Sequence, residues 1–200
     1  MTTRDTTVAV FRPDDERLRS AVELIESLGA TPVADPMLAV RETGASPRTD
    51  ADHTILTSKT GAELARETGW EPGETTVCAI GPATADALRE QGYEVDIVPD
   101  EYTSSGLVET LADHVDGSRV EVARSDHGSQ VLLDGLEAAG AYVHETVLYE
   151  LVRPDGAGGS AELAASGDLD AVCFTSSLTV ENFLAAADER GIRAAAVAGL

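Results

Sequence analysis

Four segments of the sequence place hydroxyl side chains or glycine between an apolar run and a helix-like run. They are Thr57-Ser58-Lys59, Gly81-Pro82-Ala83-Thr84, Thr103-Ser104-Ser105-Gly106 and Thr175-Ser176-Ser177. A turn that leads from a strand into a helix presents unpaired backbone N–H groups and the positive end of the helix dipole. Such a turn binds anions without many basic side chains. The four turns together therefore predict the binding of a polyanion.

Each turn also has a plainer interpretation as a helix start. Ser and Thr often cap helices, and Pro82 suits a first helical position because it lacks the N–H that would be unpaired there. Gly81 lacks a side chain and would let a ligand approach the backbone. One turn alone would indicate only a cap, so the recurrence carries the interpretation. The sequence has neither a GxxxxGK[ST] loop nor a GxGxxG fingerprint, and ordinary nucleotide binding is not supported.

Two arginines at corresponding points of the chain, Arg12 and Arg124, are further candidates for anion binding. The alternative is that they form surface ion pairs with Asp14 and Asp126. The four histidines show no metal-ligand spacing, so no metal is expected. The two cysteines, Cys78 and Cys173, each lie in an apolar run, which predicts two buried thiols.

The composition limits the possible functions. The 200 residues carry 36 acidic against 14 basic side chains, a net charge of −22, and Lys59 is the single lysine. With 42% hydrophobic residues the chain should fold, so the charge indicates an acidic surface adapted to high salt, as in a halophile. Such a field excludes nucleic acid as a partner. The sequence has no membrane-length apolar run and no signal-peptide pattern, which predicts a cytoplasmic protein.

Apolar runs and helical runs alternate along the chain. The expected strands are Thr7–Phe11, Met37–Val40, His53–Leu56, Thr76–Ile80, Glu94–Val98, Arg119–Val122, Val147–Val152 and Ala171–Phe174. The helical runs between them end at Gly29, Gly69, Gly92, Gly140 and Gly191. This alternation predicts an α/β fold with parallel sheets flanked by helices on both faces.

The sequence also repeats itself. Val8, Val10 and Arg12 recur as Val120, Val122 and Arg124, and the pair Thr57-Ser58 recurs as Thr175-Ser176. Two related α/β domains follow from this repeat. We expect residues 40–152 to form one domain, inserted into a discontinuous domain of residues 1–39 plus 153–200. Because the discontinuous domain is the shorter, a strand, turn and helix are expected to be missing at its C-terminal end.

In order along the chain, RP, LTS, AIGPATADAL, VLY and FTSS resemble the uroporphyrinogen-III synthase family. The resemblance runs from about Val8 to Gly191. It implies two similar domains joined by a two-stranded linker. It also implies a monomeric lyase of haem biosynthesis, without a cofactor. Such an enzyme takes hydroxymethylbilane, removes water, inverts the last pyrrole ring and closes the macrocycle. The backbone amides of the four turns would hold the eight carboxylates of this substrate.

The resemblance also assigns roles to residues. The tyrosine of VLYELV, Tyr149, is the catalytic candidate, because a phenol can donate a proton to a leaving hydroxyl. An aromatic residue in a linker strand can also serve only for packing. Arg12, Thr84 and the two Thr-Ser pairs match the family's binding positions. A second I-G-x-x-T-A turn is expected late in the family's first domain, but the chain reads VAGL there.

Two other functions remain open from the sequence. A two-lobed binding or regulatory protein for an anionic small molecule would keep the fold without the chemistry. A phosphosugar or nucleotide enzyme on a flavodoxin-like fold rests on analogy of fold alone.

Overall fold

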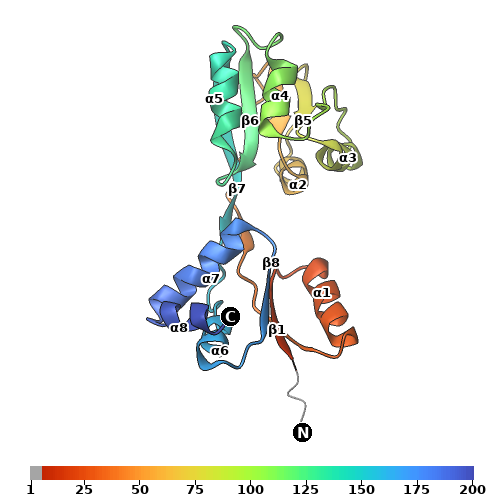
Figure 1. Ribbon diagram of the computed structural model, residues 1–200. Coiled ribbons are helices and arrows are strands. Elements are labelled where there is room, and N and C mark those ends of the chain that lie inside the picture. Colours follow the sequence, from red (N-terminus) through yellow and green to blue (C-terminus); the bar gives the residue numbers. More distant parts are fainter. Residues whose placement is uncertain (1–5) are drawn as a thin grey trace. The chain divides into compact units, whose positions relative to one another are not determined.

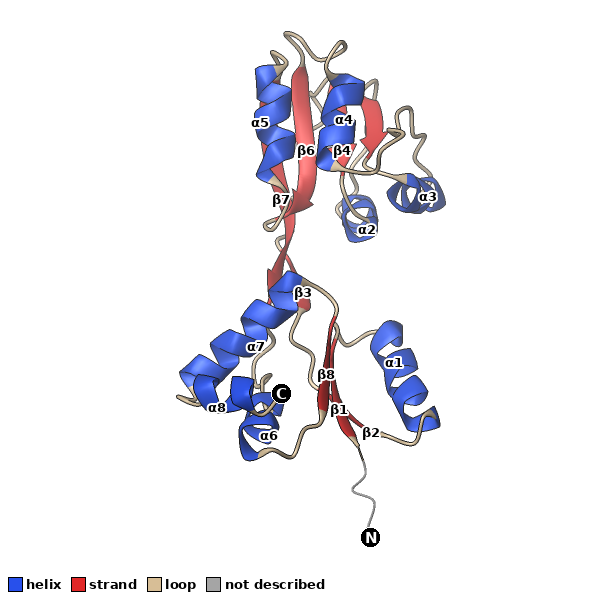
Figure 2. Cartoon of the chain, in the orientation of Figure 1, coloured by secondary structure: helices blue, strands red, loops and turns tan. Residues whose placement is uncertain are grey.

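The computed structural model describes residues 6–200, which divide into two compact units. The first unit comprises residues 6–40 with Leu151–Leu200, and the second unit is Arg41–Glu150. The strands are β1 (Thr7–Phe11), β2 (Thr31–Ala34), β3 (Ala39–Glu42), β4 (His53–Leu56), β5 (Thr76–Ala79), β6 (Arg119–Ser125), β7 (Tyr142–Val152) and β8 (Ala171–Phe174). The helices are α1 (Glu16–Ser27), α2 (Lys59–Glu67), α3 (Pro82–Glu90), α4 (Ser104–Leu111), α5 (Gln130–Ala138), α6 (Ser160–Ser166), α7 (Ser177–Glu189) and α8 (Arg193–Ala198) (Figures 1 and 2).

The second unit is built on a sheet with the strand order β3-β7-β6-β4-β5. Strands β7, β6, β4 and β5 pair in parallel, and Val122 of β6 lies opposite Ile55 of β4. Six of the seven residues of β6 are buried. This burial follows from the place of β6 between two neighbouring strands with helices on both faces. It includes the polar residues Glu121 and Arg124.

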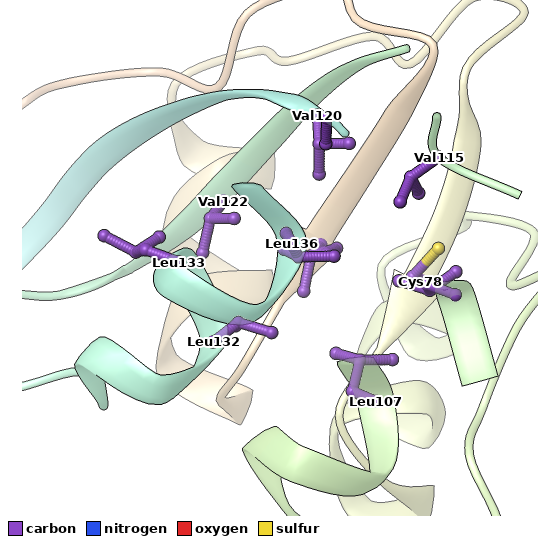
Figure 3. Packing of buried hydrophobic residues seen from close by; sticks show 11 residues of the cluster. Cys78, Leu107, Val115, Val120, Val122, Leu132, Leu133 and Leu136 are labelled. Carbon is purple, nitrogen blue, oxygen red and sulfur yellow. The ribbon is translucent and has the colours of Figure 1, made fainter. Parts of the chain in front are cut away.

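One face of this sheet packs on helices α4 and α5. Figure 3 shows Val120 and Val122 of β6 facing side chains of the two helices, with Cys78 of β5 in the same cluster. The helices contribute Leu107, Leu111, Leu132, Leu133 and Leu136. On the other face, a Cβ atom at Gly61 of α2 would lie 3.6 Å from the side chain of Leu148. The apolar residues two apart in each strand therefore decide which helices cover which face.

The first unit has a smaller parallel sheet with the order β2-β1-β8. Figure 1 shows α1 on one side of these strands and α6, α7 and α8 on the other. Its core includes an aromatic cluster in which the Phe11 ring lies 4.9 Å from that of Phe174 and 5.5 Å from that of Phe183. The buried carboxylate of Asp35 accepts hydrogen bonds from the N–H groups of Gly158 and Ser160, which fixes the start of α6.

The chain passes between the two units in two strands. One crossing falls within β3 and the other within β7, and these strands are neighbours in the sheet. The N–H of Thr43 donates to the carbonyl of Leu148 at 3.1 Å, and Arg41 forms an ion pair with Glu150. The expected fold class, α/β with two parallel sheets flanked by helices and a two-stranded connection, is therefore confirmed.

Several expected element boundaries differ from the structure. The strand expected at Glu94–Val98 is wrong, since this segment contributes only an isolated bridge between Ile97 and Cys78. The carboxylate of Asp96 accepts the N–H of Val77 at 2.7 Å, so a side chain takes the place of a ladder carbonyl. The crossing strand expected at Met37–Val40 is instead β3, and β7 begins five residues before the expected Val147.

The sequence analysis did not predict strand β2. Its prediction that both thiols are buried is wrong for Cys173. Strand β2 is short and contains Pro32, which hid its signal. Cys78 is buried as expected, but Cys173 is exposed. Among the described residues, β8 has β1 as its only strand neighbour, and this leaves Cys173 uncovered. The five glycine stops are confirmed, because all have a positive φ, from 67° at Gly191 to 91° at Gly140.

Candidate functional site

A cavity of about 230 Å³ lies at the carboxyl ends of the second unit's parallel strands. Five of the predicted site residues line it, namely Thr57, Ser58, Ser104, Arg124 and Tyr149. Thr57 and Ser58 follow β4, and Ser125 at the end of β6 joins them. Ligands of open parallel sheets bind at this end of the strands. The structure therefore gathers residues from three of the chain's separate motifs at the expected edge.

Three helices begin at this cavity. Ser58 is the N-cap of α2, Ser104 is the first residue of α4, and Ser129 is the N-cap of α5. All three serines line the cavity. Helix N-termini carry unpaired N–H groups and a partial positive charge. The cavity can therefore attract anions although the chain as a whole is strongly acidic.

Tyr149 and Ser58 are joined by a hydrogen bond. The hydroxyl of Tyr149, a residue 7% exposed, donates to Oγ of Ser58 at 3.0 Å. The same Oγ accepts the N–H of Gly61 at 2.9 Å. A hydroxyl has one proton and two lone pairs. Because both lone pairs of Ser58 are engaged, its own proton is left to donate to a third group.

Arg124 is a buried residue that organises the site. It is 3% exposed, its Nε donates to Oε1 of Glu145 at 2.6 Å, and its Nη1 donates to the carbonyl of Ser129 at 2.6 Å. A Cβ atom at Gly128 would lie 2.3 Å from Cδ of Arg124, so glycine is needed for the turn to pass over it. The alternative of a surface ion pair is therefore wrong for Arg124. Its guanidinium ties β6, β7 and the start of α5 together.

The structure also places His127 in the lining of this cavity. Its Nδ1 lies 2.9 Å from Oδ1 of Asp126, and 45% of its side chain is exposed. The sequence analysis considered histidines only for metal binding. Yet the segment Ser125–Ser129 has the same signature as the four turns, with small and hydroxyl residues between a strand and a helix. That signature could have identified His127.

The turn from Gly81 to Thr84 differs from this group. Gly81 is the N-cap of α3, and a Cβ atom there would lie 3.1 Å from Cβ of Tyr102. Thr84 is 5% exposed within α3. Within the part of the chain that the structure describes, the lining of the cavity contains Ile80 but none of the residues 81–84. Gly81 thus has a packing role against Tyr102.

The remaining turn residues in the second unit have separate positions. A Cβ atom at Gly106 would lie 2.3 Å from the carbonyl oxygen of Glu101, so the start of α4 requires glycine for packing. Lys59 and Ser105 are exposed in the first turns of α2 and α4. They lie beside the cavity-lining residues in sequence but are not themselves among the described lining.

The last group of predicted residues lies in the first unit. Arg12 follows β1 and Thr175 follows β8, and these strands are parallel neighbours, so both residues lie at the same edge of the sheet. The hydroxyl of Thr175 donates to the carbonyl of Phe11 at 3.1 Å. Ser176 caps α7 in a reciprocal capping box with Thr179, and Ser177 is the first residue of that helix. The repeat thus places corresponding residues at corresponding strand ends.

A second, larger cavity of about 440 Å³ lies at the opposite, amino ends of β6 and β7. Its arginines are already paired, since Arg48 binds Asp50 through two hydrogen bonds and holds the pKa of that carboxyl down, to about 2. Glu121 is fully buried and bonds His144 at 2.6 Å. No helix begins among its described lining residues. The smaller cavity is therefore the better candidate for an anionic substrate.

Two kinds of feature are absent from residues 6–200. No three His, Cys, Asp or Glu side chains in this range gather so that they could hold a metal ion. None of the helices in this range is long and apolar enough to cross a membrane.

The fold and the site define a class of protein. It is a two-unit α/β protein whose inserted unit gathers helix N-termini, hydroxyl groups and one tyrosine at the carboxyl edge of a parallel sheet. Comparison with known families is more specific. The family described as Uroporphyrinogen-III synthase HemD matches residues 19–199. The chain belongs to the uroporphyrinogen-III synthase family.

Individual relatives agree with this assignment. The chain is 38% identical to a uroporphyrinogen-III synthase homologue of Methanothermobacter thermautotrophicus, across 92% of this chain and 78% of that protein. It is 31% identical to the uroporphyrinogen-III synthase of Synechococcus elongatus, across 67% of this chain and 54% of that protein. The sequence evidence thus covers most of the chain.

Solved structures share the fold. A crystal structure of mutant uroporphyrinogen III synthase from Thermus thermophilus matches with a TM-score of 0.67 and 20% identity, covering 95% of this chain and 81% of that one. The enzyme of Helicobacter pylori matches with a TM-score of 0.60 and 14% identity, covering 91% and 78%. At these identities the likeness establishes the architecture.

Proposed function

We propose that this chain converts hydroxymethylbilane into uroporphyrinogen III as a lyase that needs no cofactor. The observation that carries the proposal is the cavity where the Tyr149–Ser58 pair meets the N-termini of three helices. A linear tetrapyrrole with many carboxylates requires anion binding and a proton donor at its leaving hydroxyl. Helix N-termini could meet the first need and the phenol of Tyr149 the second, in a chain that belongs to the synthase family.

In this proposal the helix N-termini and their hydroxyl residues bind the substrate. Ser58, Ser104 and Ser129, each at the start of a helix, line the cavity. They and the helix N-termini would hold carboxylates of the substrate. The proposed binding set is otherwise as the sequence predicts: Arg12, Thr57, Ser58, Lys59, Gly81, Pro82, Ala83, Thr84, Ser105, Gly106, Arg124, Thr175, Ser176 and Ser177. Arg124 acts by positioning, since its guanidinium is bonded to Glu145 and Ser129.

Tyr149 supplies the proton for the loss of water. The proton of Ser58 passes to the leaving hydroxyl, the carbon–oxygen bond breaks, and Tyr149 passes its own proton to Ser58 along their hydrogen bond. Ring closure then releases one proton from a pyrrole carbon, and this proton restores the phenol. The balanced result is one molecule of water and one macrocycle for each linear substrate.

The experiment is an assay of the product isomer. Purified chain receives hydroxymethylbilane, and the product is oxidised and separated into type I and type III isomers. Type III in excess of type I supports the proposal, because closure without ring inversion gives type I. Binding of the substrate without formation of type III would favour the alternative of a binding or regulatory protein.

We also propose that the protein is a cytoplasmic monomer of an organism with high internal salt. Supporting this are the net charge of −22 and a pair of cysteines that are both free. Salt screens distributed repulsion, with a screening length of about 3 Å near molar concentration. The melting temperature should therefore rise from low to molar potassium chloride, and a flat or falling melting temperature would exclude this adaptation.

A further inference from the structure

Two basic side chains, Arg124 and His127, are among the described lining of the cavity around Tyr149. The guanidinium of Arg124 is 3% exposed and bonded to Glu145 and Ser129. The other basic residue among the described lining is His127, with 45% of its side chain exposed. The imidazole of His127 is therefore the more accessible of the two basic groups in this lining.

We propose that His127, in its protonated form, binds one carboxylate of the substrate and makes binding at this cavity depend on pH. This inference rests on the proposed function and assigns a specificity role to a residue outside the predicted set. Histidine changes its charge between about pH 5 and 8. An imidazole without its second proton cannot form an ion pair with a carboxylate.

The hydrogen bond to Asp126 gives the imidazole its orientation. Nδ1 of His127 lies 2.9 Å from Oδ1 of Asp126, so Nδ1 carries the proton that this bond needs. The second ring nitrogen then remains to donate to a ligand when the ring is protonated. In this arrangement the carboxylate of Asp126 orients the imidazole of His127 for contact with a carboxylate of the ligand.

The other charged or titratable groups around the turn are already paired. The guanidinium of Arg124 donates to Glu145 at 2.6 Å. The hydroxyl of Tyr149 is bonded to Ser58. Among the described lining, the imidazole of His127 is therefore the basic group best exposed to a ligand.

The turn does not need the imidazole for its own shape. The N–H of Asp126 donates to the carbonyl of Tyr149 at 3.2 Å, and the N–H of Gly128 donates to the carbonyl of Ser125 at 3.1 Å. These backbone bonds fix the chain on both sides of His127. Replacement of the imidazole should therefore leave the fold intact and change only what the cavity binds.

The test measures affinity for uroporphyrin III, the oxidised form of the proposed product, from about pH 6 to about pH 8.5. Fluorescence titration is applied to the unmodified chain and to His127→Gln, His127→Lys and His114→Gln. The last is a control, because His114 is exposed after the end of α4 and lies outside the described lining of the cavity. Circular dichroism checks that each variant is folded.

The expected results differ for each variant. The unmodified chain and His114→Gln should lose about tenfold in affinity across this pH range, the loss of one charge-assisted contact. His127→Gln should bind weakly at every pH, and His127→Lys should bind well at every pH. The proposal is overturned if His127→Gln keeps the affinity and the pH dependence of the unmodified chain, or if His127→Lys fails to restore binding.

Isomer assays on the same preparations separate this inference from the proposed function. If the chain makes type III product and His127→Gln has an unchanged KM and pH profile, the inference fails and the function stands. If the chain makes no type III product but binds uroporphyrin III through His127, the function fails and the inference stands. If it neither binds nor reacts, both fail.

Discussion

The two units place repeat-related strands in different surroundings. Strand β4 of the second unit lies between β5 and β6, and its Ile55 and Leu56 are fully buried. Strand β8 of the first unit pairs with β1, and its residues alternate between exposed and half-buried. Each strand is followed directly by a Thr-Ser pair, Thr57-Ser58 after β4 and Thr175-Ser176 after β8. The comparison teaches that the neighbours of a strand, more than its own sequence, decide how deeply it is buried.

The same Thr-Ser pair also differs in its contacts. Oγ of Ser58 accepts both the N–H of Gly61 and the hydroxyl of Tyr149. Oγ of Ser176 accepts the N–H of Thr179 at 3.3 Å, and Thr179 returns a bond to the backbone of Ser176. Ser176 acts as a helix cap, whereas Ser58 is a cap that also contacts the candidate catalytic tyrosine. One repeated motif thus makes two different sets of contacts.

The largest expected effect concerns the cores of the two sheets. The repeat matches Ile55 to Cys173. Ile55→Ala should lower the free energy of unfolding by about 2–5 kcal/mol, because it empties a fully buried position. Cys173→Ala should change it by less than about 0.5 kcal/mol, because Cys173 is exposed. Urea unfolding at one fixed salt concentration measures both, and equal losses would contradict the comparison.

The next effect concerns two tyrosines of one strand, β7. Tyr149→Phe removes the hydroxyl that donates to Ser58 and keeps the ring, so kcat should fall about 100-fold with little change in stability. Tyr142→Phe is the matched control, since Tyr142 is 71% exposed and lies at the other end of the strand. If Tyr149→Phe keeps full turnover, the phenol is not the proton donor and its ring serves for packing.

A smaller effect separates the two repeated serines. Ser58→Ala and Ser176→Ala each remove a helix cap, so each should cost about 1 kcal/mol of stability. Only Ser58→Ala should also lower kcat, because only Ser58 bonds the hydroxyl of Tyr149. Thermal unfolding and steady-state kinetics on both variants test this pair. A similar fall in kcat for Ser176→Ala would show that the two turns do not differ in function.

The reactivity of the two cysteine thiols measures how well each is buried, without any substitution in the protein. Burial raises the pKa of the Cys78 thiol to about 12, so Cys78 stays protonated near neutral pH. Cys173 is exposed and should react readily with a disulfide reagent such as Ellman's reagent. One thiol should react in the folded protein and the second only after unfolding. Fast reaction of both thiols would mean that the second unit is less well packed than described.

The sequence was sufficient for those parts of the fold that local patterns determine. The glycine stops, most strands and the Thr-Ser turns follow from propensity and spacing, and the structure confirms them. Contacts between residues far apart in the sequence could not be predicted. The burial of Arg124, for example, depends on its hydrogen bond to Glu145 on the neighbouring strand. The exposure of Cys173 likewise depends on the strand order, which the residues of β8 do not contain.

The candidate site was predictable in part for the same reason. The hydroxyl turns predicted Thr57, Ser58 and Ser104 as site residues, and all three line the cavity where helices begin. His127 was missed because its role depends on which other cations are already bonded, and this became visible only with the contacts of Arg124. Gly81 and Gly106 were correctly placed at helix starts, but their neighbours Tyr102 and Glu101 show a packing role.

The measurement that tests the central claim most directly is the isomer composition formed from hydroxymethylbilane by the unmodified chain and by Tyr149→Phe. The account predicts mainly type III uroporphyrinogen with the unmodified chain and a rate about 100-fold lower with the variant. Type I product alone, formed at the rate seen without protein, would contradict it, because the cavity at the helix N-termini would then not direct the inversion of the last ring.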